Sequence, residues 1–192
     1  MRIISGQARG LKLKAPRGSE VRPTTDRVKE TLFAILGDVS GQRVLDLFAG
    51  SGALGLEALS RGAEEVVLVE KKRQILQTLE FNLSRVRHCL PQDNDSEVRV
   101  LRADARKIPE ILEARENGFD IIFADPPYVE AKNSYGARQL LIDPAFRHWA
   151  GTALLVLEHP SDLSIPPEAY ENWRFLRQRR FDRTTISFAR PV

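Results

Sequence analysis

The sequence predicts a Rossmann-like α/β fold, with a mostly parallel sheet, helices on both faces of the sheet and an antiparallel hairpin at one edge. Short apolar runs alternate with helical patterns between residues 44 and 157, as they do in βαβ units. A glycine-rich segment follows the first central run. The last two runs, near residues 173–181 and 184–189, have no helix-length segment between them and so predict the antiparallel pair.

The elements expected before the sheet are a small hairpin and a capped helix. Residues 2–5 and 11–13 flank a glycine-containing turn, which predicts a short N-terminal β-hairpin. Thr24 and Thr25 precede an amphipathic stretch that ends at Gly37, which predicts a helix with a threonine N-cap. We therefore expect a basic N-terminal extension over residues 1–23 and one α/β domain over residues 24–192.

The elements of the domain follow in order from the apolar runs and from the helical spacing between them. Strands are predicted at residues 44–48, 65–70, 98–101, 119–124 and 152–157, and helices at about residues 53–61, 72–87, 105–116 and 137–149.

Composition narrows the class of protein. A chain of 192 residues with 42% hydrophobic and 29% charged content is ordinary for a soluble globular protein. Cys89, His88, His148 and His159 show no metal-ligand spacing, so no metal is expected. The sequence contains neither an apolar run of about 18 residues nor a signal-peptide pattern, so we expect a cytoplasmic protein with no membrane partner.

The charge is unevenly distributed along the chain. Residues 1–30 carry eight Lys and Arg against three acids, and residues 171–192 carry six Arg against two acids. The formal net charge of the whole chain is +3, so the region between these ends is acidic. Two basic ends favour a polyanionic partner, and nucleic acid is the usual one.

The segment Asp46–Gly55 predicts a nucleotide-type ligand at the end of the first central strand. Gly50, Gly52 and Gly55 match G-x-G-x-x-G, which by itself also fits a dinucleotide. Asp46 distinguishes the ligands, because a carboxylate there would repel a pyrophosphate and attract the ammonium of an amino acid such as S-adenosylmethionine. Glu70, after the next strand, is placed for ribose hydroxyls, and Asp104, after the third, for an adenine amino group.

The segment Asp125–Tyr128 predicts a clamp for a planar amino group. It follows the apolar run 119–124, so it is expected at the carboxyl end of a buried strand. Asp125 and the carbonyl of Pro126 can accept the two N–H groups of an exocyclic amine, and the prolines fix the backbone and offer no competing donor. Tyr128 can stack on a nucleobase that has left its helix.

These motifs make the sequence similar to a known family. The Asp46–Gly55 and Asp125–Tyr128 motifs resemble those of class I methyltransferases that modify exocyclic amino groups. The segment 22–33 and the opening residues 2–10 resemble the RsmD-type bacterial 16S ribosomal RNA guanine-N2 methyltransferases. One departure is Phe181-Asp182-Arg183, where the family's last hairpin has a glycine, although aspartate also tolerates turn geometry.

The resemblance implies S-adenosylmethionine as the cofactor, and 16S ribosomal RNA, in a partly assembled small subunit, as the partner of a monomeric enzyme. The catalytic residues it implies are Asp125, Pro126, Pro127 and Tyr128. The cofactor-binding residues expected are Asp46, Phe48, Ala49, Gly50, Ser51, Gly52, Gly55, Glu70, Lys71, Asp104 and Ala105. The RNA-binding residues expected are Arg2, Arg9, Arg22, Thr24, Thr25, Arg27 and Lys29.

Two other functions fit the same motifs. A DNA adenine-N6 or cytosine-N4 methyltransferase could use the same clamp, because all three substrates present a conjugated amine. The chain has no segment left for a domain that reads duplex sequence, which argues against this alternative. A cofactor-binding RNA chaperone or ribosome-assembly factor without turnover is the non-enzymatic alternative.

Overall fold

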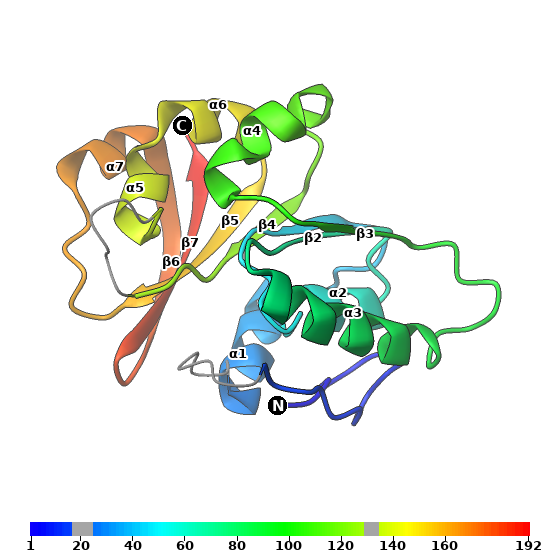
Figure 1. Ribbon diagram of the computed structural model, residues 1–192. Helices are drawn as coiled ribbons and strands as arrows, with labels where there is room; N and C mark the ends of the chain where they lie inside the picture. Colours follow the sequence, from blue (N-terminus) through cyan, green and yellow to red (C-terminus); the bar gives the residue numbers. More distant parts are fainter. Residues whose placement is uncertain (17–24, 129–134) are drawn as a thin grey trace. The chain divides into compact units, whose positions relative to one another are not determined.

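In the computed structural model, which describes residues 1–16, 25–128 and 135–192, the chain divides into two units, Met1–Arg102 and Ala103–Val192. The boundary predicted between residues 23 and 24 lies outside the described residues, so that division stays a prediction. Each unit combines strands with packed helices (Figure 1).

The first unit contains three parallel strands in the order β3-β2-β1. Its elements are α1 (Asp26–Leu36), β1 (Arg43–Asp46), α2 (Gly55–Ser60), β2 (Glu65–Val69), α3 (Arg73–Arg87) and β3 (Glu97–Leu101). The central strand β2 is buried along its whole length, as its apolar sequence requires. Helix α2 packs against β1 and β2, and it begins directly after the glycine-rich segment.

The predicted first helix is confirmed as α1. The Thr25 hydroxyl accepts a hydrogen bond from the Val28 N–H at 3.3 Å, which satisfies one of the free donors of the first turn. Gly37, at a φ of 76°, ends the helix. Thr24 lies outside the described residues.

The predicted N-terminal hairpin is present but shorter than expected. An antiparallel bridge joins Arg2 to Lys12, and backbone hydrogen bonds from Ile3 to Leu11 and from Leu13 to Met1 flank it. The hairpin is short because neighbouring backbone donors are taken by side chains of α2. Glu57 accepts from the N–H groups of Ile4 and Ser5 at 2.8 and 3.0 Å, and Ser60 accepts from the N–H of Ala8. A ladder cannot extend through donors that are already bonded.

The second unit has the strand order β4-β5-β7-β6, with β4 and β5 parallel and the rest antiparallel. Its elements are α4 (Ile108–Ile111), β4 (Ile121–Ala124), α5 (Ala137–Ile142), α6 (Pro144–Ala150), β5 (Leu154–Pro160), α7 (Pro167–Asn172), β6 (Trp173–Phe181) and β7 (Thr184–Pro191). The predicted closing hairpin is β6–β7, and Asp182 takes the left-handed turn position at a φ of 52°. The register of β6 shifts between Phe175 and Arg177.

Two predicted helices of the second unit differ from the structure. The stretch 105–116 breaks into α4 and two short 3₁₀ turns, Ala105–Lys107 and Glu113–Arg115. The stretch 137–149 divides into α5 and α6 because Asp143 leaves helical geometry and caps α6, which begins with Pro144. Helix α7 was not predicted. No helix among the described residues has the length and apolar character needed to cross a membrane.

Candidate cofactor and base-binding residues

Asp46 is a buried carboxylate at the end of β1, only 3% exposed. It accepts a hydrogen bond from the Gly55 N–H at 3.0 Å. Burial raises the pKa of this carboxyl to about 7, although the N–H groups of Gly55 and Phe48 oppose the shift. A Cβ on Gly55 would lie 2.3 Å from the side chain of Leu68 in β2, so the close approach of α2 to β2 requires glycine.

The glycine-rich loop is tied to Glu70. The Gly50 N–H donates to one oxygen of the Glu70 carboxylate at 3.2 Å, and the Lys72 N–H donates to the other at 2.7 Å. Gly50 and Gly52 have φ values of 53° and 87°, which glycine adopts without strain. Glu70 therefore connects the loop to the start of α3 and still has lone pairs that could accept from ribose hydroxyls.

Asp104 caps the first 3₁₀ turn of the second unit. Its carboxylate accepts from the Arg106 backbone N–H at 3.1 Å and pairs with the Arg106 guanidinium at 3.0 Å. This is the helix-cap role that such a residue commonly has. Adenine binding by Asp104 stays a prediction, and the adenine amino group would have to share this carboxylate with Arg106.

The four residues after β4 form a rigid turn whose aromatic ring is exposed. Asp125 is partly buried, Pro126 is buried, and Tyr128 is 41% exposed. The Tyr128 hydroxyl donates to Glu158 at 3.0 Å and lies 2.7 Å from the Thr184 hydroxyl. These partners come from β5 and β7, so the ring is anchored at its polar end and presents surface for stacking.

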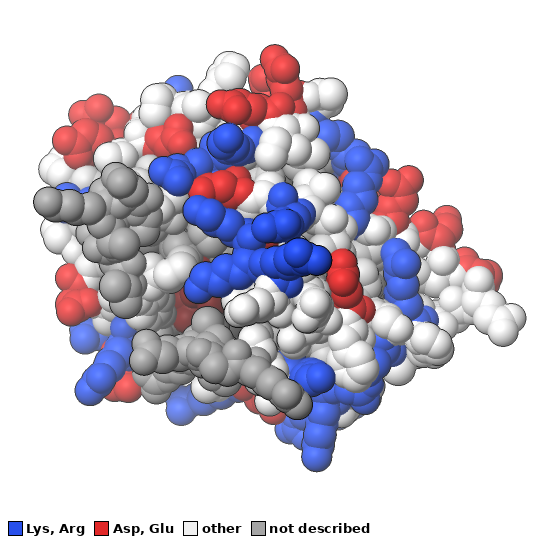
Figure 2. Space-filling view, in the orientation of Figure 1, with Lys and Arg blue, Asp and Glu red and all other residues white. Residues whose placement is uncertain are grey.

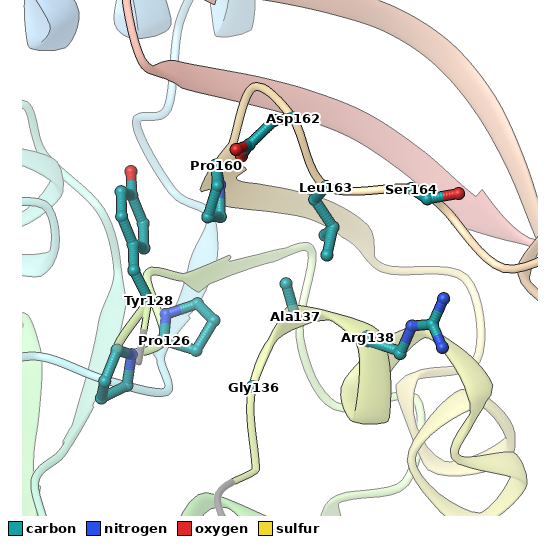
Figure 3. A pocket seen from close by; sticks show the side chains of 10 residues that line it. Pro126, Tyr128, Gly136, Ala137, Arg138, Pro160, Asp162, Leu163 and Ser164 are labelled. Carbon is teal, nitrogen blue, oxygen red and sulfur yellow. The ribbon is translucent and has the colours of Figure 1, made fainter. Parts of the chain in front are cut away.

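A pocket of about 440 Å³ lies beside this turn, within the size range of small-ligand sites (Figure 3). Figure 3 shows Tyr128 and Pro126 on one side, and Arg138 and Ser164 on the other. Its lining residues are Pro126, Pro127, Tyr128, Gly136, Ala137, Arg138, Pro160, Asp162, Leu163 and Ser164. The sequence predicted the first three, but not those from α5 and from the loop after β5. The sequence around Pro160 contains no motif that could have identified these residues as part of a pocket.

The basic N-terminal residues are divided between surface and interior. Arg9 and Arg27 are exposed, and Arg2 is exposed while pairing with Asp26 at 2.9 Å. Figure 2 shows Lys and Arg side chains gathered in patches on the face in view. Arg22 and Thr24 lie outside the described residues, and the Thr25 hydroxyl serves as the helix cap described above.

The prediction that Lys29 contacts phosphate is wrong. Its side chain is fully buried, and its ammonium bonds to Glu57 at 3.2 Å and to the backbone carbonyl of Arg2. Burial lowers the pKa of Lys29, and the Glu57 carboxylate opposes that shift. Spacing could have signalled this, because Lys29 stands three and four residues before the buried Leu32 and Phe33 on the same helix face.

Glu57 is a positioning residue that the sequence reasoning missed. Its buried carboxylate accepts from two N-terminal backbone donors, from Lys29 and from Arg61 at 2.9 Å. An acid inside an otherwise buried apolar helix was the available signal. In the part of the chain that the structure describes, no three His, Cys, Asp or Glu side chains group as metal ligands would.

Comparisons with known proteins identify the family. The profile of the family described as "Conserved hypothetical protein 95" matches residues 1–190. YlbH of Bacillus subtilis is 42% identical over 170 residues, which cover 86% of each chain. The Haemophilus influenzae protein named ribosomal RNA small subunit methyltransferase D is 34% identical over 181 residues, covering 93% of this chain and 88% of that protein.

Solved structures agree with this assignment. The structure of yhhF from Escherichia coli matches with a TM-score of 0.70 and 34% identity, and the match covers 100% of this chain and 97% of that one. The predicted Rossmann-like α/β class with an antiparallel edge is thereby confirmed. The chain belongs to the Conserved hypothetical protein 95 family, the RsmD-type methyltransferases.

Proposed function

We propose that this protein transfers a methyl group from S-adenosylmethionine to the exocyclic N2 amino group of a guanine in 16S ribosomal RNA. The observation that carries the proposal is the Asp125–Tyr128 turn at the end of β4, with its anchored aromatic ring and adjoining pocket. The name of the Haemophilus influenzae relative supports ribosomal RNA as the substrate class. The protein acts as a monomer in the cytoplasm on a partly assembled small subunit.

The cofactor residues fit an amino acid joined to a nucleoside. S-adenosylmethionine, when bound, supplies an electrophilic methyl group on a sulfonium. Asp46 pairs with its ammonium, Glu70 accepts from the ribose hydroxyls, and Asp104 accepts from the adenine amino group. The residues that line the cofactor are Phe48, Ala49, Gly50, Ser51, Gly52, Gly55, Lys71 and Ala105.

The base residues hold an amine that is a poor nucleophile, because its lone pair is delocalised into the ring. Asp125 and the Pro126 carbonyl accept its two N–H groups, which favours a pyramidal nitrogen with a directed lone pair. The prolines keep that carbonyl in place because their φ angles are fixed. Positioning of this kind supplies much of the rate enhancement in a bimolecular transfer. The proton on nitrogen leaves to Asp125 or to water after the transfer.

Two substitutions of Tyr128 distinguish the contribution of its ring to RNA binding from that of its hydroxyl. We expect Tyr128→Leu to raise KM for the RNA substrate by about five- to 150-fold, because base stacking contributes about 1–3 kcal/mol. Tyr128→Phe keeps the ring, so its KM should stay within about five-fold of that of the unchanged protein. That difference is the cost of leaving Glu158 and Thr184 with one hydrogen-bond partner fewer. Steady-state kinetics with small subunits measure both effects. Equal KM values for the two variants would exclude stacking by Tyr128.

The raised pKa of Asp46 predicts a pH-dependent cofactor affinity. A carboxyl with a pKa of about 7 is half protonated at that pH, and pairing with an ammonium lowers the pKa and so releases a proton. Affinity should therefore rise as the pH increases from about 6 to about 7, and the rise should end near pH 8, where the amino group of the cofactor loses its own proton.

Calorimetry in two buffers of different ionisation enthalpy measures the protons released by cofactor binding at pH 7. The control is Asp46→Asn, which keeps an oxygen acceptor for the Gly55 N–H and leaves only protons lost or gained by the ligand. Equal proton release by the two proteins would show that Asp46 does not pair with the ammonium.

The reaction itself is tested with small ribosomal subunits from a strain that lacks this gene. Transfer of labelled methyl from S-adenosylmethionine is followed by mass spectrometry of the product nucleosides. N2-methylguanosine in 16S RNA is the expected product. N6-methyladenine or N4-methylcytosine in DNA would identify a DNA methyltransferase, and cofactor binding without transfer to either nucleic acid would identify an assembly factor.

A further inference from the structure

Phe81 is an exposed aromatic residue on a helix whose other large apolar side chains are buried. Its side chain lies on the outer face of α3 and is 48% exposed, whereas Leu79, Leu83 and Val86 face the core. Single exposed apolar residues are common on protein surfaces, so exposure alone assigns no role. The charged and polar groups around Phe81 distinguish it from an ordinary exposed apolar residue.

Two cations lie against the Phe81 ring. The Lys14 ammonium is 5.1 Å from the ring centroid, and the Arg85 guanidinium carbon is 5.8 Å from it. A surface depression of about 410 Å³ is lined by Lys14, Phe81 and the polar side chains of Gln77 and Thr78. Gln77, Phe81 and Arg85 are spaced four residues apart on α3 and therefore share one face.

Partly buried hydrogen bonds hold the backbone of Lys14, and an exposed one holds the Arg85 guanidinium. Asn82, which is fully buried, accepts from the Lys14 N–H at 2.8 Å and donates to the Lys14 carbonyl at 2.9 Å. The Arg85 guanidinium donates to the Lys12 carbonyl. Asn82 also donates to the carbonyl of Ser51 in the glycine-rich loop at 2.9 Å. The N-terminal segment is thus fixed to α3 at the point where Lys14 reaches Phe81.

We propose that Lys14, Gln77, Thr78, Phe81 and Arg85, here called the Phe81 patch, bind one nucleotide of a single-stranded RNA segment. The base stacks on the Phe81 ring, Lys14 and Arg85 contact the flanking phosphates, and Gln77 and Thr78 supply hydrogen bonds. The inference rests on the proposed action on ribosomal RNA, and it adds a contact outside both the cofactor residues and the Asp125–Tyr128 turn.

The balance of interactions favours a base over the present cation contacts. An exposed cation–π contact changes an equilibrium constant by about two- to five-fold, whereas a stacked base changes it by about five- to 150-fold. A base can therefore displace a side chain from the ring while that side chain moves to a phosphate. The depression has no acidic lining residue among those described, which suits a polyanion.

The test is binding of a fluorescein-labelled, unstructured 12-nucleotide RNA to the full chain, followed by anisotropy. Phe81→Leu keeps an apolar side chain but removes the ring, and we expect it to weaken binding by about ten-fold. Phe81→Trp, which keeps a stacking surface, should bind within about two-fold of the unchanged protein. Tyr170→Leu is the matched control, because Tyr170 is 59% exposed and belongs to neither proposed site. Lys14→Gln should reduce the slope of log K against log salt by about 0.7.

Binding of a duplex RNA of the same sequence distinguishes the contribution of base stacking from that of charge. Phe81→Leu should leave duplex affinity unchanged, since paired bases are not available to the ring. Single-strand affinity unchanged by Phe81→Leu, or an equal loss for duplex and single strand, would overturn the proposal. The binding measurement needs no methyl transfer, so it can fail while N2-methylguanosine is still formed, and it can succeed if the modified atom is a different one.

Discussion

Replacing Asp125 with asparagine is expected to lower kcat for methyl transfer by about 10²- to 10⁴-fold while cofactor affinity stays unchanged. The attacking amine becomes positively charged as its bond to the methyl group forms, so a carboxylate beside it stabilises the transition state more than the ground state. An interaction that strengthens in this way affects kcat more than KM. Asparagine keeps the shape and an acceptor oxygen but removes the negative charge.

Single-turnover kinetics on small ribosomal subunits measure this effect, with cofactor binding measured separately by calorimetry. Glu168→Gln removes an exposed carboxylate from α7 in the same unit, and it should leave both quantities unchanged. An Asp125→Asn protein that turns over within about three-fold of the unchanged protein would exclude the proposed role of the carboxylate. A loss of cofactor affinity equal to the loss of rate would show that Asp125 serves binding instead.

The second large effect is expected on stability, from Glu57→Gln. This change leaves the buried Lys29 ammonium without its carboxylate partner, and breaking a buried pair in this way costs about 3–5 kcal/mol. The N-terminal segment should also loosen, because Glu57 accepts the N–H groups of Ile4 and Ser5. Urea titration followed by circular dichroism measures the free energy of unfolding. Tryptophan fluorescence is unsuitable, since Trp149 and Trp173 both belong to the second unit.

A second substitution tests whether the unpaired ammonium is the cause. Lys29→Met replaces the buried charge with an apolar side chain of similar length, so the double variant should recover much of the stability lost by Glu57→Gln. Glu80→Gln, an exposed carboxylate on α3, should change the free energy by less than about 0.5 kcal/mol. A double variant no more stable than Glu57→Gln would attribute the loss to the Ile4 and Ser5 contacts.

The strands and the cap of α1 were predictable because their signals are local. Buried strands are continuous apolar runs, and β2 (Glu65–Val69) lies within its predicted range, 65–70. The Asp46–Gly55 and Asp125–Tyr128 motifs were likewise predictable, because the residues of each motif lie within a few positions of a strand end.

What the sequence did not predict depends on contacts between distant segments. The hairpin expected over residues 2–13 is shortened to one bridge and its flanking backbone hydrogen bonds, because Glu57 and Ser60, more than 40 residues away in the chain, bind the next backbone donors. Lys29 was assigned to the surface by residue type, although its helical spacing places it on the buried face. The anchors of Tyr128 lie 30 and 56 residues farther along the chain, and no motif linked them to it.

The outer strand β6 has a consequence for how the protein behaves at high concentration. A strand at the end of a sheet offers unpaired backbone groups to which another chain could add. Here Arg174, Arg177, Arg179 and Arg180 are carried along that strand, most of its residues are exposed, and its register shifts near Phe175. Repulsion between like charges and a locally irregular backbone both oppose edge-to-edge pairing, so this arginine-rich edge protects the protein against aggregation.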